Sequence, residues 1–99
     1  MLSVASVIGF EWDEGNARKS AEKHAVSQAE AEQIFFNMPL IVAIDDRHSD
    51  IEQRFHALGR TDAGRPLHVT FALKQVATLI RVISARPMSR KERARYGEN

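Results

Sequence analysis

The sequence predicts an α+β fold in which an antiparallel β-sheet of about four strands follows two helices and precedes a short third helix. Residues 40–86 hold four apolar or alternating runs, which is the pattern of β-strands. The connections between these runs are of hairpin length and rich in turn residues, which favours antiparallel pairing. Helix-start signals stand before the runs, at residues 13 and 27, and after them, at residue 89.

Both helices before the sheet have recognisable starts. Asp13 is suited to cap a helix over residues 14–24. Ser27 and Glu30 have the S-x-x-E spacing of a capping box, in which the Ser oxygen accepts the amide of residue 30 and the Glu side chain reaches back. This box predicts a second helix over about residues 28–37, which Pro39 ends.

The expected strands differ in their hydrophobic patterns. Residues 40–45 form a nearly continuous apolar run, whereas residues 53–60 and 67–73 alternate apolar and polar side chains. Residues 78–86 form the most apolar run, and we expect them in the centre of the sheet. An earlier segment, residues 5–12, is expected to form a short strand or an extended entry to the fold.

The last expected strand turns basic towards its end. Arg81 and Arg86 are an odd number of residues apart, so an ideal strand presents them on opposite faces, and only a bulge or the end of the strand brings them together. Pro87 stops the strand. Ser89 and Glu92 form a second S-x-x-E box, which predicts a final helix to about Tyr96.

Size and composition indicate one domain over residues 1–99. The 99 residues fit a single domain, and a hydrophobic content of 43% suffices for one modest core. The sequence has no cysteine, which excludes disulfides and thiolate metal sites and suits a cytoplasmic location. The N-terminal MLSVASVIGF lacks a basic leader region, and no apolar run approaches the length of a transmembrane helix, so no membrane partner is expected.

Charge divides the chain into an acidic part and a basic part. Residues 1–59 carry 5 basic and 10 acidic side chains, a net charge of −5, whereas residues 60–99 carry 9 basic and 3 acidic side chains, a net charge of +6. This asymmetry fits a polyanionic partner, and it fits a solvated basic helix equally well. Arginine on a strand beside a basic helix is suited to phosphate, because one guanidinium can hold two phosphate oxygens at once.

Metal and cofactor chemistry fit the sequence poorly. No two of the four histidines stand at i,i+4 or in an H-x-H pattern. The polar run from Asp45 to Asp50 is conceivable as an oxygen-rich cluster but is more typical of a turn. The sequence also lacks P-loop, dinucleotide-binding and nucleophile-elbow motifs, so neither a metal nor a cofactor is expected.

A metal-free ribonuclease needs only side chains that this sequence contains. A base removes the 2′-hydroxyl proton, cations stabilise the charged phosphorane, and an acid protonates the leaving 5′-oxygen. The same side chains also have structural interpretations. His24 can close the first helix, and Glu52 with Arg54 can form a surface salt bridge. His56 and His68 can be exposed cross-strand partners.

Several motifs of the chain occur, in this order, in a known family. They are FEWD at 10–13, KHAVS at 23–27, E-x-R at 52–54, LGR at 58–60, GRPL at 64–67, RVISAR at 81–86 and E-R-x-x-Y at 92–96. With them the sequence resembles, from Phe10 to Tyr96, the BrnT toxins of BrnT/BrnA type II toxin–antitoxin systems. The resemblance implies a RelE-like fold and a ribonuclease activity that inhibits translation. It also implies neutralisation by a BrnA-like antitoxin, usually in a heterotetramer that binds promoter DNA.

The resemblance carries the expected site onto matching positions of this sequence. The expected catalytic residues are Lys23, His24, Glu52, Arg81 and Arg86. The expected RNA-binding residues are Arg54, Arg65, Arg93 and Tyr96, together with Arg90 on the basic last helix, and Ser84 also matches a motif position. The two strand arginines are expected to bind phosphate and stabilise the transition state. Lys23 or His24 is expected to transfer protons, and Glu52 to act as a base or as a partner of Arg54.

Three positions depart from the usual residues of the family and keep rival hypotheses open. Asn16, Ser20 and Ala25 stand where members commonly carry Lys, Asn and Gly. The missing Lys removes a possible phosphate contact, and Ala25 lacks the tolerance of glycine for a left-handed helix stop. One rival is a non-catalytic or weakened homologue that binds the antitoxin and acts in promoter autoregulation. Another is a structural partner protein with a solvated basic helix.

Overall fold

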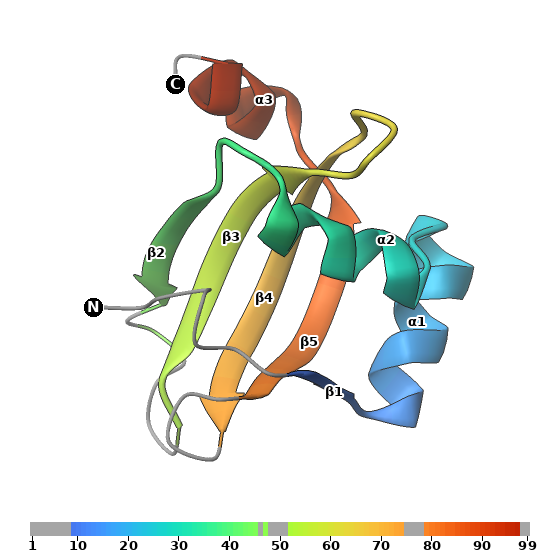
Figure 1. Cartoon of the computed structure of the whole chain (residues 1–99). Helices are drawn as coiled ribbons and strands as arrows, with labels where there is room; N and C mark the ends of the chain where they lie inside the picture. Colours follow the sequence, from blue (N-terminus) through green and yellow to red (C-terminus); the bar gives the residue numbers. More distant parts are fainter. Residues whose placement is uncertain (1–8, 46, 48–51, 75–78, 98–99) are drawn as a thin grey trace.

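A single mixed β-sheet organises the chain (Figure 1). The computed structural model describes residues 9–45, 47, 52–74 and 79–97. The elements in chain order are β1 (Gly9–Trp12), α1 (Glu14–His24), α2 (Gln28–Gln33), the 3₁₀ helix η2 (Ile34–Phe36), β2 (Ile41–Asp45), β3 (Arg54–Arg60), β4 (Pro66–Lys74), β5 (Leu79–Pro87) and α3 (Arg90–Gly97). The strands of the described residues lie in the order β1-β5-β4-β3-β2.

The α+β class is confirmed, but the sheet has five strands instead of about four. β2 to β5 form an antiparallel meander, as the hairpin-length loops predicted. The additional strand is β1, which pairs in parallel with the first half of β5, from Gly9 opposite Leu79 to Trp12 opposite Val82. Loop lengths do not reveal this pair, because its two strands are far apart in sequence and are joined through the rest of the domain.

The helices begin at the predicted caps. The Asp13 carboxylate accepts the amide of Asn16 at 3.1 Å, and Ser27 and Glu30 form a complete capping box. α2 is shorter than predicted and continues as η2. η2 consists of Ile and two Phe, residues of lower helix propensity, and tight 3₁₀ turns are common at the end of an α-helix.

α1 ends at a residue in the left-handed conformation, although this residue is alanine. Ala25 has φ 53° and ψ 40°, and its amide bonds to the carbonyl oxygen of Ala21 at 3.2 Å. The next amide, that of Val26, bonds to the carbonyl of Ser20 at 3.1 Å. The helix therefore stops where a glycine stop was expected, and the Cβ of Ala25 makes this conformation costly.

We expect Ala25→Gly to stabilise the fold by about 1 kcal/mol, because glycine adopts the left-handed conformation without steric penalty. The measurement is the free energy of unfolding from urea titration. Ala21→Gly, at an exposed position inside the same helix, is the matched control and should destabilise by about 0.5–1 kcal/mol. Equal effects of the two glycines would contradict this account of the helix end.

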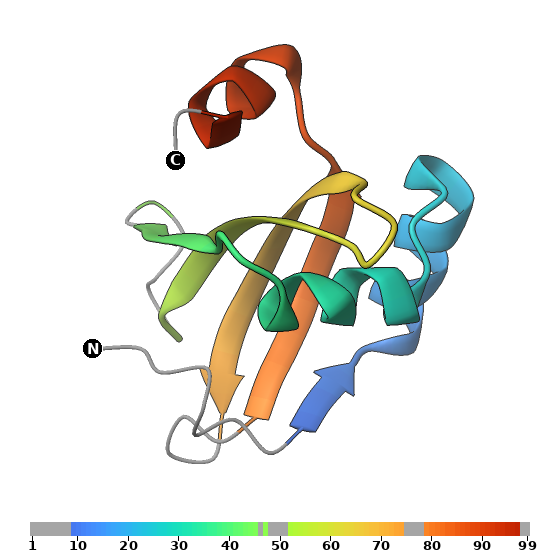
Figure 2. The ribbon, with the colours of Figure 1, turned by 45° about the horizontal axis from the view of Figure 1, so that its top comes forward.

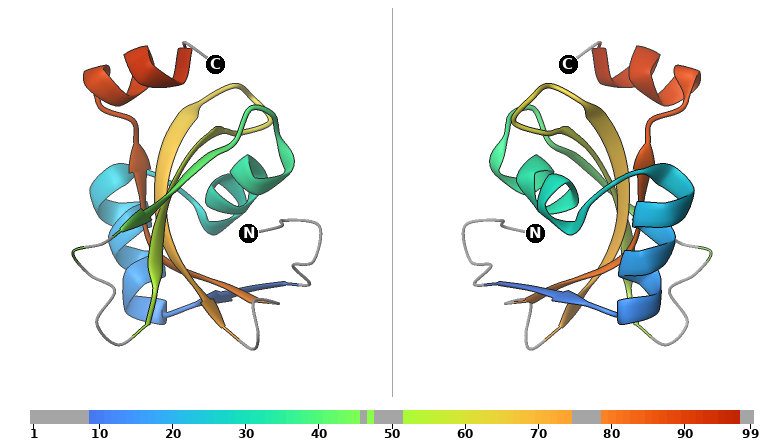
Figure 3. Two further views of the ribbon diagram at one scale, coloured as in Figure 1. Left: turned by 90° about the vertical axis from the view of Figure 1, so that its left-hand side faces the viewer. Right: turned by 90° about the vertical axis from the view of Figure 1, so that its right-hand side faces the viewer.

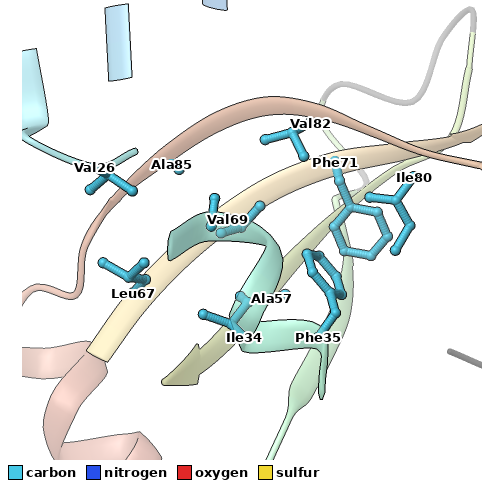
Figure 4. Close-up of a cluster of buried hydrophobic side chains, with 11 residues drawn as sticks. Val26, Ile34, Phe35, Ala57, Leu67, Val69, Phe71, Ile80, Val82 and Ala85 are labelled. Carbon is cyan, nitrogen blue, oxygen red and sulfur yellow. The ribbon is translucent and has the colours of Figure 1, made fainter. Parts of the chain in front are cut away.

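Helices lie on both sides of the sheet. Figure 3 shows α2 on one side, and α1 and α3 on the other. The core lies on the α2 side (Figure 4) and consists of Val26, Ala31, Ile34, Phe35, Ala57, Leu67, Val69, Phe71, Ile80, Val82 and Ala85. Phe71 is at its centre, with its ring centroid 5.2 Å from that of Phe35 and 5.3 Å from that of Phe55. We call the other side, which carries the polar side chains, the second face.

α1 completes the edge of the sheet where β1 stops. β1 pairs with β5 only as far as Val82. Beyond that point, the backbone amide of Ala85 donates to the buried hydroxyl oxygen of Ser20 on α1 at 3.2 Å. This bond satisfies a strand amide that would otherwise be unpaired. α3 follows β5 and stands over the end of the sheet (Figure 2), and none of the described helices is long and apolar enough to cross a membrane.

Candidate nucleic-acid interface

A β-bulge in β5 brings its two arginines onto one face. Thr70 of β4 pairs with Ser84, but the next residue, Phe71, pairs with Val82. Ile83 is therefore the extra residue of the bulge, and it shifts the alternation of side chains by one position. As a result Arg81, Ser84 and Arg86 share the second face, which an ideal strand would not allow. Their partners across the pair are Ala72, Thr70 and His68.

The two arginines share a face but lie apart along the strand. Four regular strand steps separate Arg81 from Arg86, which corresponds to roughly 13 Å. Each guanidinium contacts its own carboxylate. Arg81 Nη1 donates to Glu52 Oε1 at 2.5 Å, and Arg86 donates to both oxygens of Glu92 at 2.8 and 2.9 Å. The second face therefore has two arginine–carboxylate positions, one near each end of β5.

The Arg86–Glu92 pair fastens the start of α3 to the sheet. Glu92 also accepts the amide of Ser89 at 2.9 Å, and the hydroxyl of Ser89 accepts the amide of Glu92, so the second capping box is confirmed. The hydrogen bonds from Arg86, followed by that from the Ser89 amide, lower the pKa of Glu92 to about 2. Glu92 is thus a carboxylate at all physiological pH values, and it holds Arg86 in place.

The end of α3 is attached at a second point. The hydroxyl of Tyr96 donates to the carbonyl oxygen of Pro39 at 2.6 Å, just before β2. Arg93 Nη1 donates to the carbonyl oxygen of Met88 at 2.9 Å. α3 therefore spans from β5 to the segment that enters β2, with its ends tied to opposite parts of the sheet.

Two histidines lie side by side in the middle of the second face. The rings of His56 on β3 and His68 on β4 have centroids 4.9 Å apart. His56 Nε2 lies 2.9 Å from Asp45 Oδ2, and His56 Nδ1 lies 3.0 Å from the hydroxyl oxygen of Thr70. A buried carboxylate on one nitrogen and a hydroxyl on the other fix the orientation of this ring.

His68 is buried, which corrects the expectation of an exposed cross-strand pair. Only 8% of its surface is exposed. This burial, and then the positive charge of Arg86, lower the pKa of His68 to about 4, so the imidazole is neutral at neutral pH. Within the described residues, His68 Nδ1 has no hydrogen-bond partner, and His68 Nε2 lies 3.9 Å from Glu92 Oε2.

Two hollows adjoin His56. The first, about 260 Å³, lies beneath α3 and is lined by Ile41, Ala43, His56, Leu58, His68, Lys91, Glu92 and Arg95. The second, about 600 Å³ and more open, is lined by Ile44, Asp45, Arg47, Arg54, His56, Thr70, Ile83 and Ser84. The described residues contain no group of three or more His, Asp or Glu side chains arranged to hold a metal ion. The hollows instead offer guanidinium, imidazole and hydroxyl groups, which bind phosphate and ribose.

The other expected site residues are spread over the second face and its borders. Arg54 lines the open hollow, and the Glu52 carboxylate accepts a hydrogen bond from the guanidinium of Arg81. Arg90 is exposed at the start of α3. Lys23 and His24 form the last turn of α1, which packs along β5 on the same side of the sheet as α3 (Figure 3).

Arg65 has a structural contact at the junction of α1 and α2. Its guanidinium donates to the carbonyl oxygens of Ala25 at 2.8 Å and His24 at 3.3 Å. It also donates to Glu30 Oε2 at 3.0 Å, and this bond contributes to a lowered pKa of Glu30, after the hydrogen bond from the Ser27 amide. Arg65 thus satisfies the carbonyl groups at the end of α1, as a basic side chain commonly does.

The cluster around His56 does not follow from local sequence patterns. Alternation along β3 puts His56 on one face with Arg54, and alternation along β4 puts His68 on one face with Thr70, but neither pattern relates the two strands to one another. The signal that joins them is the register of the hairpin, in which Arg60 pairs with Pro66. From this pair, His56 lies opposite Thr70 and Leu58 lies opposite His68.

Comparison with known proteins supports the family that the sequence motifs indicate. Residues 12–92 match the family model of the ribonuclease toxin BrnT of type II toxin–antitoxin systems. The chain belongs to the BrnT toxin family. The match covers most of the sequence and confirms the resemblance, and membership in a type II family implies an antitoxin partner.

The fold agrees with a solved BrnT structure. The 1.1 Å crystal structure of the Brucella abortus ribonuclease toxin BrnT is 21% identical in sequence, with a TM-score of 0.60. The similarity covers 85% of this chain and 100% of the Brucella chain. At this identity the likeness concerns the fold, and the arrangement of strands and helices is that of BrnT. No curated protein sequence matches the chain.

Proposed function

We propose that this BrnT-family chain is a metal-independent endoribonuclease toxin that inhibits translation by cleaving RNA. The observation that carries the proposal is the bulge at Ile83, which gathers Arg81, Ser84 and Arg86 on one face with the two central histidines. Cations, hydroxyls and imidazoles on one face of the sheet are the groups that phosphodiester cleavage requires. Family membership supports the reaction class.

In this proposal the arginines supply the electrostatic part of catalysis. Arg81 and Arg86, being far apart, bind different phosphates of one RNA strand, and the one at the cleaved bond stabilises the phosphorane. Arg54, Arg90 and Arg93 contact flanking phosphates. RNA approaching either strand arginine must share it with its carboxylate, so part of the binding free energy offsets a weakened ion pair.

The proton-transfer groups are assigned from the same surface and its border. Glu52, beside Arg81, is the proposed base for the 2′-hydroxyl group, since it is a carboxylate next to a phosphate-binding cation. Lys23 and His24, at the end of α1, are the alternative proton-transfer groups. Arg65 and Tyr96 act in this proposal by holding the α1–α2 junction and α3 at the RNA-binding face.

The proposed partner is a BrnA-like antitoxin that covers the second face, and the complex is proposed to form in the bacterial cytoplasm. Residues 60–99, which supply β4, β5 and α3, carry a net charge of +6. An antitoxin seated there would exclude RNA by occupying the same cations. The complex is proposed to be a heterotetramer that binds the promoter of its own operon.

The test is induced expression of the chain alone in a bacterial host, with growth and RNA integrity followed together. We expect arrest with RNA cleavage for the natural sequence, and relief of both by Arg86→Ala at equal protein level. Arg18→Ala removes an exposed arginine of α1 that pairs only with Glu14 among the described contacts, and it should arrest growth like the natural chain. Normal growth and intact RNA with soluble, folded natural protein would contradict the toxin proposal.

One observation favours keeping the non-catalytic alternative. Both strand arginines are already ion-paired, so the surface can bind phosphate without leaving either cation poised for a transition state. A binding module of this kind should bind RNA with a strong salt dependence and leave it intact. Salt-dependent binding together with cleavage identifies the enzyme.

A further inference from the structure

The hollow beneath α3 is a half-open pocket rather than a flat part of the sheet. α3 is tied at one end through Glu92 to Arg86 and at the other through Tyr96 to Pro39. The helix therefore forms a roof over the ends of β2 and β3, and the space left below it is about 260 Å³. Hydrogen bonds hold α3 at both ends, so the pocket is already formed in the free chain, as ligand sites usually are.

The floor of this pocket is apolar and its inner wall is made of imidazole. Ile41, Ala43 and Leu58 supply the floor from β2 and β3. His56 and His68 supply the wall, with their ring planes inclined by 40°. Flat apolar surface beside aromatic rings suits a planar ligand, which can stack on a ring and displace water from the floor.

His68 adds an imidazole whose hydrogen bonds are unfilled. Its Nε2 faces the Glu92 carboxylate at 3.9 Å, beyond hydrogen-bond distance, and its Nδ1 is buried without a partner among the described residues. A ligand that enters the pocket thus meets the His68 ring, whose neutral imidazole can donate or accept one hydrogen bond.

The rim of the pocket is cationic. Lys91 and Arg95 stand at i,i+4 on α3, and both line the pocket. The one acid in the lining, Glu92, already binds the Arg86 guanidinium through both oxygens. The exposed ammonium group of Lys91 therefore favours an anion beside the pocket, while the floor accepts a planar apolar group.

We propose that the pocket beneath α3 binds one unpaired nucleobase of the RNA substrate, with the adjoining phosphate on Lys91, and that it sets the base preference of the toxin. The inference deepens the proposed ribonuclease function and rests on it for its biological meaning. An apolar side chain of a protein partner would use the floor, but it would leave Lys91 and the His68 imidazole without a role. A base with its phosphate uses all three.

The test measures binding, so it does not depend on cleavage. The full chain is titrated with each of the four ribonucleoside 5′-monophosphates, and with ribose 5-phosphate and inorganic phosphate, while the ring-proton NMR signals of His56 and His68 are followed. We expect the nucleotides to shift both imidazole signals, and one base to bind roughly tenfold tighter than ribose 5-phosphate, as expected for stacking of one base.

Two variants locate the binding. Ala43→Phe fills the floor from an exposed position of β2 and should abolish the nucleotide-induced shifts, while the rest of the spectrum shows a folded chain. Lys91→Ala should weaken nucleotide binding several-fold, and Lys19→Ala on α1 is the matched control, with no expected effect. In a cleavage assay, Ala43→Phe should remove the base preference.

Three results would overturn the inference. Equal shifts from inorganic phosphate and from all four nucleotides would mean that only an anion binds. Nucleotide binding that Ala43→Phe leaves unchanged would place the base elsewhere. If no nucleotide binds and Ala43→Phe instead prevents neutralisation by the antitoxin, the pocket belongs to the protein partner. Since RNA cleavage by the natural chain is measured separately, loss of the ribonuclease proposal and loss of the pocket proposal are distinct outcomes.

Discussion

Arg86→Ala should reduce RNA cleavage by roughly 10²–10³-fold, the usual cost of removing one donor that stabilises a developing negative charge. Arg86 combines a planar fork of donors with a fixed position, because Glu92 holds it through two hydrogen bonds. Arg86→Lys should recover little, since an ammonium cannot make the paired contacts to Glu92 and to phosphate at once. The measurement is the rate of cleavage of a defined RNA by equal amounts of folded protein.

The same substitution also loosens α3, and a second variant separates the two effects. Loss of the Arg86 guanidinium leaves the Glu92 carboxylate without its charged partner and should cost about 1–2 kcal/mol, at the low end for a charged hydrogen bond because the Arg86 side chain is 36% exposed. Adding Glu92→Gln removes the unpaired charge and keeps a capping-box acceptor. Arg86→Ala with Glu92→Gln should therefore regain stability and stay inactive. Cleavage that returns together with stability would mean that Arg86 acts only on the fold.

Acid should destabilise the protein through His68. Its pKa is about 4 in the folded state and 6.5 ordinarily, so between these pH values the unfolded chain binds the proton and the folded chain does not. The free energy of unfolding is then fully present above pH 6.5 and falls as the pH drops towards 4, by roughly 2–3 kcal/mol. The physical cause is the cost of placing a charged imidazole in a buried position next to the Arg86 guanidinium.

Urea unfolding at a series of pH values tests this dependence. His68→Gln replaces the imidazole by a neutral polar group and should flatten the curve between pH 6.5 and 4, whatever its effect at neutral pH. Glu92 contributes in a lower window, because its folded pKa of about 2 is below the ordinary 4.5, so its stabilisation is lost only as the pH falls below 4.5. An unchanged slope in His68→Gln between pH 6.5 and 4 would contradict the assignment.

The parts of the fold that sequence predicts well are those set by neighbouring residues. Asp13, Ser27 and Ser89 start their helices through bonds to residues three positions away, and these bonds form as expected. The strand boundaries also follow from local alternation. The parallel pairing of β1 with β5 depends on contacts between distant segments, and no local pattern encodes it.

The site residues also divide into those that local motifs identify and those that only the pairing of strands brings together. The motif RVISAR singled out Arg81 and Arg86, but whether they share a face depended on the bulge at Ile83, which only pairing with β4 reveals. Likewise, the cluster of Asp45, His56 and Thr70 joins three strands. Residues 46 and 48–51, where a polar turn was expected, lie outside the described part of the chain.

The most direct test of the central claim is cleavage of RNA by the purified chain in the presence of EDTA, on free RNA and on ribosome-bound messenger RNA. Attack by the 2′-hydroxyl without a metal predicts products with a 2′,3′-cyclic phosphate and a 5′-hydroxyl end, and no cleavage of a strand that is 2′-deoxy at the cleaved position. RNA left intact by folded protein in both settings, or cleavage that EDTA abolishes, would contradict the account.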